Sequence, residues 1–225
     1  MENITFTETK FNMLLLFVII FVLALPFTAK AWPVDSYQDI RYEHVRGQDT
    51  LSSCGPASLA TLFVSFYGME TSEDQIIKLV KPYLEKEIEK LKEGELPEGG
   101  VSMLDLKKVS AELGVPSKGY KIPEKKMFSI LKRLKTPLLV HLEKPRRHFV
   151  LSVAVFSGQI ILADPSWGIR RISKEGFFDK WDGMVLAFSP RKEDKQLSDG
   201  VISKIKKQME QKDRTQDISR RFLWN

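Results

Sequence analysis

The sequence predicts an α+β fold in which helices come first and an antiparallel sheet follows. Before Pro137, apolar residues recur at helical spacing, as at Leu104, Leu106, Val109 and Leu113. After Pro137 the pattern changes to short runs of β-branched and large apolar residues separated by turn residues. Helices followed by strands along the chain are typical of α+β proteins.

The helical part is expected to begin after an extended segment over residues 32–47. A helix then starts near Cys54 and ends near Gly68, because apolar residues recur at helical spacing between them. A second helix starts at Thr71 or Ser72, since either side chain can cap it and acidic residues follow in its first turn.

The charged continuation over residues 81–94 predicts an exposed helix with i,i+4 charge pairs, interrupted or kinked at Pro82. Residues 96–100 are rich in glycine and proline and predict a loop. Ser102 caps the next predicted helix, which stops at Gly114.

A short helix that begins at Pro123 or Glu124 ends the helical part. The apolar runs that follow predict strands over residues 137–142, 148–156, 159–164, 170–173 and 184–188. Ser157 and Gly158 are expected to form the turn of a hairpin, and residues 175–181 a short helix or turn.

Residues 1–31 have the features of a targeting segment. Lys10 precedes an uncharged apolar run over residues 13–27, and alanines at positions 29 and 31 have the spacing of a signal peptidase site. The run is shorter than the roughly 20 residues that span a bilayer. We therefore expect an export signal cleaved before Trp32, with an uncleaved membrane anchor as the alternative.

Residues 32–190 are expected to form one globular domain, and residues 191–225 a charged C-terminal tail or helix. The chain has 28% charged and 43% hydrophobic residues, a composition typical of a globular protein. Its net charge is +6, but basic residues alternate with acidic ones, which argues against a nucleic-acid surface. Residues 191–225 fit an amphipathic helix on the domain, a membrane or a partner, and equally a partly disordered tail. The oligomeric state stays open.

Cys54 is the only cysteine, and it is expected at the N-terminus of the first helix. Unpaired backbone N–H groups and the helix dipole favour an anion there, such as a thiolate. A lone cysteine is alternatively a small buried apolar residue. Because Cys54 lies among Ser52, Ser53 and Gly55 and not in the apolar stripe, we favour a nucleophile.

A thiol nucleophile needs a base, and the chain has three histidines. His44 is an ordinary polar residue in this interpretation. His141 lies within a predicted strand, whereas His148 opens the strand after a charged loop, where a rigid scaffold can present a base to a cleft. We therefore favour His148 over His141.

Asp164 ends the strand that follows His148 in the predicted hairpin. A two-residue turn would set Asp164 opposite Leu151 and not His148, so Asp164 must lie beyond the regular pairing or the turn must be longer. An aspartate before Pro165 is equally explained as a turn former. The residues alone leave both interpretations open.

Four segments of the chain also resemble a known family: QDTLSSCGPASLATL, EGGVSMLDLKKVSAELGV, RRHFVLSV and IILADPSWGIRRISKEGFFDKWDGMVLAF. Together they are similar to the C39 family of papain-like cysteine peptidases, which includes the domains that remove double-glycine leaders from bacteriocin precursors. The resemblance runs from about residue 46 to residue 188. It implies a papain-like fold, with the helical part and its nucleophile packed on the C-terminal antiparallel sheet.

The resemblance also implies roles for four residues. Cys54 would be the nucleophile, His148 the general base and acid, and Asp164 the group that orients the imidazole. Gln48 would donate its side-chain amide to the oxyanion hole, together with the backbone N–H of Cys54. The expected reaction is thiolate attack on a peptide carbonyl, followed by hydrolysis of the thioester.

The expected protein is an exported cysteine peptidase, periplasmic or extracellular, that acts on a peptide or protein. Well-known family members are fused to ATP-driven exporters, but this sequence has no phosphate-binding glycine loop, so cleavage after Gly-Gly stays open. No cofactor or metal is expected, because one cysteine and three scattered histidines do not make a zinc site. The alternatives are a transamidase or other acyltransferase, and a non-catalytic peptide-binding or assembly module of the same fold.

Overall fold

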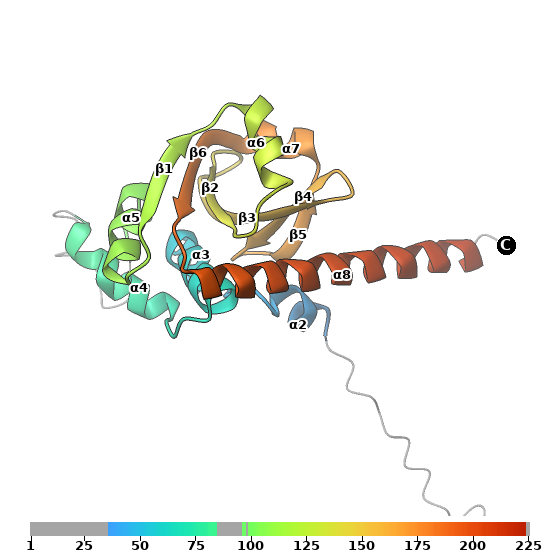
Figure 1. Cartoon of the computed structure of the whole chain (residues 1–225), viewed down its shortest axis with the longest axis horizontal. Helices are drawn as coiled ribbons and strands as arrows, with labels where there is room; N and C mark the ends of the chain where they lie inside the picture. The colour runs from blue at the N-terminus through green and yellow to red at the C-terminus, as the bar shows by residue number, and fades with distance from the viewer. Residues whose placement is uncertain (1–35, 85–95, 98, 224–225) are drawn as a thin grey trace, which may run out of the picture. The chain divides into compact units, whose positions relative to one another are not determined.

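The computed structural model describes residues 36–84, 96, 97 and 99–223 (Figure 1). The predicted targeting segment and most of the predicted charged helix, residues 85–94, lie outside this range. Within the described residues, no helix is both long and apolar enough to cross a membrane.

The N-terminal half is helical, as predicted. Its helices are α2 (Tyr37–Tyr42), α3 (Cys54–Thr61), the π-helical turn Leu62–Phe66, α4 (Glu73–Val80), the 3₁₀ turn Lys81–Tyr83 and α5 (Met103–Glu112). The predicted caps are confirmed, because Ser72 and Ser102 each accept a hydrogen bond from a backbone N–H in the first turn of their helix.

The prediction of an extended segment over residues 32–47 is wrong over residues 37–42, because α2 lies there. Ser36 and Asp39 form a capping box, in which each side chain accepts a hydrogen bond from the backbone of the other. This reciprocal bonding starts a helix that has no apolar periodicity to reveal it.

A six-stranded antiparallel sheet forms the second half, in the order β1-β6-β2-β3-β4-β5. Its strands are β1 (Ser117–Lys121), β2 (Leu138–Leu142), β3 (His148–Phe156), β4 (Gln159–Asp164), β5 (Gly168–Ile172) and β6 (Trp181–Phe188). Two further helices, α6 (Glu124–Leu131) and α7 (Lys174–Lys180), were both predicted. β1 was not predicted, because it is a polar edge strand with four of its five residues exposed.

The two faces of the sheet have separate cores. Leu139 and Leu151 pack with residues of α3, α4, α5 and the π-helical turn, whereas Val140 and Val150 pack with residues of α6 and α7. Adjacent residues of a strand point to opposite faces, so both faces of a continuous apolar run such as β3 are buried. The helices on the first face carry the nucleophile candidate.

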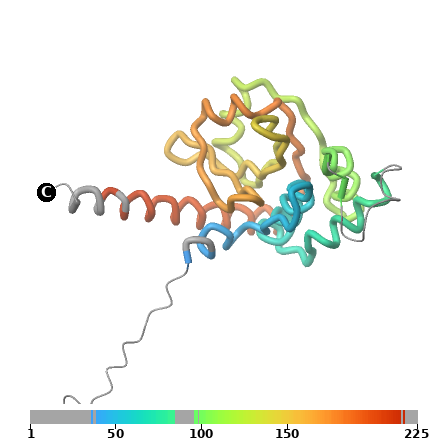
Figure 2. Tube along the Cα trace, turned by 180° about the vertical axis from the view of Figure 1, so that it is seen from behind, coloured from blue at the N-terminus to red at the C-terminus, as the bar shows by residue number. Residues whose placement is uncertain are grey.

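The C-terminal segment forms one long helix, α8 (Lys192–Leu223). Val201, Ile202 and Ile205 of this helix are buried in the first core. Farther along, Asp213 accepts two hydrogen bonds from the guanidinium of Arg171 on β5, at 2.8 and 2.7 Å. The later turns of α8 extend past the sheet in both views (Figures 1 and 2).

The β3–β4 hairpin contains a β-bulge that changes the register predicted from its turn. Ser157 and Gly158 form the two-residue turn, and Phe156 pairs with Gln159. Between Ser152 and Ala154 the register shifts by one, so Leu151 pairs with Ala163. A shift of one residue moves the following side chain to the other face of the sheet. The bulge therefore places Asp164 on the same face of the sheet as His148, one residue beyond the last pair of β3 and β4, Leu151 with Ala163.

Gly168 begins β5 at a position where only glycine fits. Its φ is +68°, and a Cβ built on it would lie 2.5 Å from the carbonyl oxygen of Arg41, at the end of α2. We predict that Gly168→Ala lowers the free energy of unfolding by about 3 kcal/mol, measured by urea denaturation. Gly158→Ala is the matched control, because its φ is +77° but nothing lies within 4 Å of its Cβ. Equal losses in the two variants would show that the contact with α2 contributes nothing.

Candidate active site

Cys54 is the first residue of α3, as predicted, and it is buried, with 9% of the residue exposed. The helix packs closely on its neighbours at this point, because a Cβ on Gly55 would lie 2.7 Å from Val101 and 3.3 Å from the ring of Phe149. Glycine after the cysteine thus lets the N-terminus of α3 approach the sheet. Cys54 is the one cysteine of the chain and forms no disulfide.

The first residues of β3 contact α3, and they are not paired with β4. The pairing of β3 with β4 ends at Leu151, so the N–H and C=O of Phe149 have no strand partner on that side. The Phe149 N–H points at Cys54 Sγ, 3.5 Å away, and the hydroxyl of Ser58 donates to the Phe149 carbonyl at 3.0 Å. Cys54 and Ser58, one helical turn apart, thus bond the two backbone groups of Phe149 that β4 leaves unpaired. These two bonds hold the thiol beside His148.

His148 and Asp164 form a hydrogen bond of 2.7 Å between Nε2 and Oδ1. The Asp164 side chain is fully buried and is held from two further directions. Arg170 donates to its Oδ2 at 2.8 Å, and the backbone N–H of Ser166 donates to Oδ1 at 2.9 Å. The His148 ring also bonds the side chain of Cys54, and because Nε2 is taken by Asp164, Nδ1 is the nitrogen left for this bond.

These contacts change the proton affinities of the pair. Burial of the His148 ring disfavours its protonation, but hydrogen bonds to Asp164 and Cys54 and the charges of both outweigh burial and raise its pKa to about 9. Burial by itself would raise the pKa of Asp164, yet the His148 hydrogen bond and the charges of His148 and Arg170 hold it below its usual value. The imidazole is therefore a cation at neutral pH.

Gln48 lies in the loop that leads to α3 and links it to the turn after Asp164. Its backbone N–H donates to the Pro165 carbonyl at 3.1 Å, and its Oε1 accepts from the hydroxyl of Ser166 at 2.7 Å. Its amide nitrogen donates to the Thr50 carbonyl at 2.7 Å. An amide group has two protons, so within the described residues one donor is left for a ligand.

The other two histidines have different partners. His141 Nδ1 lies 2.6 Å from Asp182 Oδ2, and its ring packs on Phe149 with centroids 5.1 Å apart. His44 lies beside Glu43, with Nε2 and Oε1 3.5 Å apart. Neither has a contact with Cys54 among the described residues.

Sequence reasoning missed Arg170 as the second partner of Asp164. The available signal was the tight turn after Asp164, which pairs Asp164 with Gly168 and therefore sets Arg170 opposite Leu162 on the same face. No group of three His, Cys, Asp or Glu side chains that could hold a metal ion occurs within the described residues.

The arrangement has the parts of a thiol-dependent acyl-transfer site, and comparison with known proteins identifies the family. Residues 42–193 match the sequence model of the Peptidase C39 family. The chain belongs to this family. Its relationship to the C39 family was predicted from the sequence and is confirmed.

Two curated relatives are named "Probable functional amyloid protease FapD". The protein from Pseudomonas fluorescens is 28% identical over 155 residues, and the one from Pseudomonas aeruginosa is 30% identical over 155 residues. Each alignment covers 68% of this chain and 64% of the relative, so the chain spans less than two-thirds of these relatives' length. The transport/processing ATP-binding protein ComA of Streptococcus pneumoniae is 27% identical over 72% of this chain and 21% of its own length.

Two solved structures share the fold. The peptidase domain of Streptococcus ComA has a TM-score of 0.54 and 24% identity, covering 66% of this chain and 98% of that domain. A double glycine motif protease from an AMS/PCAT transporter, in complex with the leader peptide, has a TM-score of 0.51 and 24% identity, covering 65% and 91%. The α+β fold of the papain-like C39 domains is thereby confirmed.

Proposed function

We propose that the chain hydrolyses a peptide bond with Cys54 as the nucleophile, His148 as general acid and base, and Asp164 as the residue that orients His148. The observation that carries this proposal is the connected set Cys54–His148–Asp164, in which His148 bonds both a buried carboxylate, at 2.7 Å, and the side chain of Cys54. A nucleophile, a base and an orienting group in this relation form the general arrangement for covalent catalysis.

The proposed reaction begins with the proton of Cys54 on His148. The thiolate attacks the peptide carbonyl carbon, and the carbonyl electron pair moves to the oxygen. The backbone N–H of Cys54 and the amide of Gln48 donate hydrogen bonds to this oxyanion. The imidazolium then gives its proton to the leaving amine as the C–N bond breaks, which leaves a thioester. Neutral His148 takes a proton from water, the hydroxide attacks the thioester, and the thiolate leaves.

A test of the Gln48 role separates oxyanion stabilisation from thiol reactivity. We expect Gln48→Ala to lower the turnover number for peptide cleavage by about 10²–10³-fold, because one donor to the oxyanion is lost. Alkylation of Cys54 by iodoacetamide forms no oxyanion, so its rate is expected to stay within about twofold of wild type.

Ser166→Ala is the matched control for Gln48, because it removes the hydroxyl that bonds Oε1 and leaves the amide donor in place. We expect it to lose less turnover than Gln48→Ala. An equal loss of alkylation and cleavage in Gln48→Ala would contradict the oxyanion role.

We propose an exported protein or peptide as the substrate. The export-type segment over residues 1–31 supports a periplasmic or extracellular site of action, with the chain released or held by that segment as a membrane anchor. The relatives named as probable functional amyloid proteases support a protein of an amyloid system as the substrate. The double glycine motif protease among the structural neighbours makes a Gly-Gly sequence the first cleavage site to test.

The function is tested with a mixture of synthetic peptides of diverse sequence, including Gly-Gly pairs and their Ala-Ala counterparts, and products identified by mass spectrometry. We expect cleavage that requires Cys54 and is lost in Cys54→Ser. Repeating the reaction with glycinamide distinguishes hydrolysis from transfer, because an acyltransferase yields products carrying the added amine. Peptide binding without any Cys54-dependent product would support the non-catalytic alternative.

A further inference from the structure

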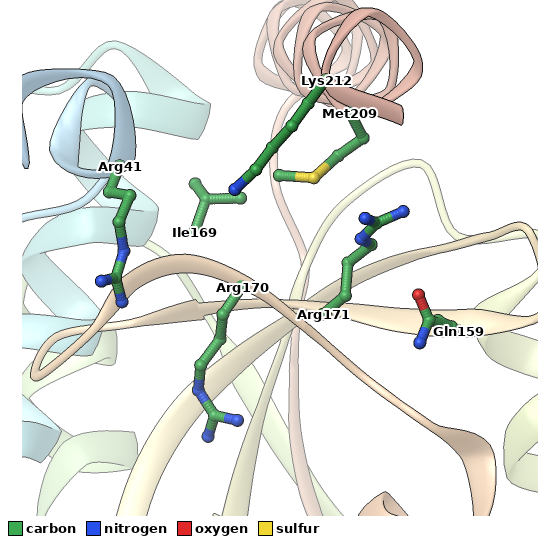
Figure 3. A pocket seen from close by; sticks show the side chains of 7 residues that line it. All are labelled: Arg41, Gln159, Ile169, Arg170, Arg171, Met209 and Lys212. Atoms are coloured by element: carbon green, nitrogen blue, oxygen red, sulfur yellow. The ribbon is translucent and has the colours of Figure 1, made fainter. Parts of the chain in front are cut away.

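The oxyanion loop, residues 48–53, leads to α3 and carries Gln48, the proposed oxyanion donor. One end of the loop is held by the turn after Asp164, because Gln48 Oε1 accepts a hydrogen bond from the Ser166 hydroxyl. That turn is itself anchored by β5, from which Arg170 points away from α8 and bonds Asp164 (Figure 3). A contact that holds the other part of the loop comes from α4.

Glu73, the first residue of α4, is a buried acidic residue, with 7% of it exposed. Carboxylates are seldom buried unless they are paired. Glu73 Oε1 accepts a hydrogen bond from the Asp49 N–H at 3.2 Å, and the carboxylate also bonds the side chain of Ser53. Burial raises the pKa of Glu73, whereas the bonds from Ser53 and Asp49 favour its charged form. Glu73 therefore links the oxyanion loop to α4.

Ser53 connects Glu73 to the carbonyl group that fixes Gln48. Its hydroxyl accepts a hydrogen bond from the Thr50 N–H at 3.1 Å, and its own N–H donates to the Thr50 carbonyl at 3.3 Å. The same carbonyl accepts a hydrogen bond from the amide nitrogen of Gln48 at 2.7 Å. A serine at the N-cap usually accepts from an N–H of the first helical turn, but Ser53 makes no such bond at the start of α3. Its hydroxyl is used within the loop instead.

We propose that Glu73 is a positioning residue, which holds the oxyanion loop so that the second amide proton of Gln48 points to the oxyanion. This inference rests on the proposed function, because it requires the oxyanion role of Gln48. Glu73 acts through Ser53 and Thr50 and touches no reacting atom. One amide proton of Gln48 goes to the Thr50 carbonyl, so displacement of that carbonyl redirects the other proton as well. An oxyanion donor is effective only within hydrogen-bond distance of the developing charge.

The turnover number tests this role, because a misplaced donor weakens the transition state and not the binding of the substrate. Glu73→Ala is expected to lower kcat for peptide cleavage about tenfold, with KM within about twofold of wild type. Alkylation of Cys54 by iodoacetamide forms no oxyanion, and its rate should change by less than about twofold. Asp74→Ala is the matched control, because Asp74 is exposed in the same helical turn and forms no bond with the oxyanion loop among the described residues. We expect it to keep the wild-type kcat.

Two conservative variants separate the position of the carboxylate from its charge. Glu73→Gln removes the charge but keeps an acceptor oxygen for the Asp49 N–H, so kcat is expected within about threefold of wild type. Glu73→Asp keeps the charge but draws it back by one methylene group, so kcat is expected to fall as in Glu73→Ala. This pair decides the question where Glu73→Ala lacks the urea transition of wild type.

A double variant shows whether Glu73 acts through Gln48. In a Gln48→Ala background, Glu73→Ala is expected to lower kcat by less than about twofold further, because residues that act through one interaction are not additive. Independent roles would multiply the two losses and overturn the proposal. Equal kcat values in Glu73→Ala and Asp74→Ala would overturn it too, and so would equal losses of cleavage and alkylation in Glu73→Ala.

Hydrogen exchange of the Asp49 amide, followed by NMR in the full chain, needs no substrate. Because this N–H bonds Glu73, its exchange is expected to be about tenfold faster in Glu73→Ala and unchanged in Glu73→Gln and Asp74→Ala. Equal exchange in Glu73→Ala and Asp74→Ala would overturn the proposal by itself. If wild type cleaves no peptide, the proposed function fails, and the exchange rates still show whether Glu73 holds the loop. The two proposals can therefore fail separately.

Discussion

Cys54→Ala is expected to abolish peptide cleavage and to leave the fold intact. The thiol is the only group of the site that can form the thioester, so its removal should lower the rate by at least about 10⁴-fold. The side chain is small, and the hydrogen bond that it accepts from the Phe149 N–H is long, at 3.5 Å. The free energy of unfolding is therefore expected to change by about 1 kcal/mol or less.

The measurement combines product formation from a cleaved peptide with urea denaturation of the same preparation. Ser52→Ala is the matched control, because it deletes a side-chain heteroatom two residues before Cys54, in the loop that leads to α3, and should keep its activity. Cleavage by Cys54→Ala at the wild-type rate would exclude Cys54 as the nucleophile. Loss of cleavage together with loss of the folding transition would instead give Cys54 a structural role.

Most of the fold could be predicted because its elements carry local signals. Ser72 and Ser102 cap their helices, and the apolar runs after Pro137 are buried on both faces of the sheet. The two errors have physical causes. α2 depends on a reciprocal cap between Ser36 and Asp39, without an apolar stripe, and β1 is a polar edge strand that pairs with β6 through its backbone.

The candidate site was less accessible to sequence reasoning, because its geometry depends on the register of the sheet. Cys54 and His148 were proposed from their places at a helix start and a strand start. Asp164 stayed undecided from the residues alone, since a regular two-residue hairpin sets it opposite Leu151. The bulge between Ser152 and Ala154 places Asp164 on the same face of the sheet as His148. No local pattern in the sequence predicts a bulge at this position. The role of Arg170 follows from the same register.

His148→Ala is expected to slow alkylation of Cys54 by about 10²-fold at pH 6–7. In wild type the imidazolium stabilises the thiolate beside it, so Cys54 should react with iodoacetamide faster at this pH than an ordinary cysteine does. His141→Ala is the matched control, because His141 bonds Asp182 and has no contact with Cys54 among the described residues. Its alkylation rate is expected to equal that of wild type.

The same pair predicts how cleavage depends on pH. The pKa of His148 is raised to about 9 from its ordinary value of 6.5, so the ring is protonated at neutral pH and deprotonates as the pH passes about 9. Protonated His148 supplies the proton of the leaving amine, so kcat/KM is expected to fall as the pH rises through about 9. The folded state is stabilised by the protonated ring below about pH 6.5, and this stabilisation is lost as the pH rises through about 9.

The outcomes distinguish an activated pair from two unrelated residues. If His148→Ala and His141→Ala slow alkylation equally, the reactivity of Cys54 comes from its position at the N-terminus of α3 and not from His148. If all three proteins react with iodoacetamide only as slowly as an ordinary cysteine, Cys54 is not activated and the peptidase mechanism proposed for this site fails. A slow rate in His148→Ala alone, with wild-type cleavage falling above pH 9, assigns the proton transfers to His148.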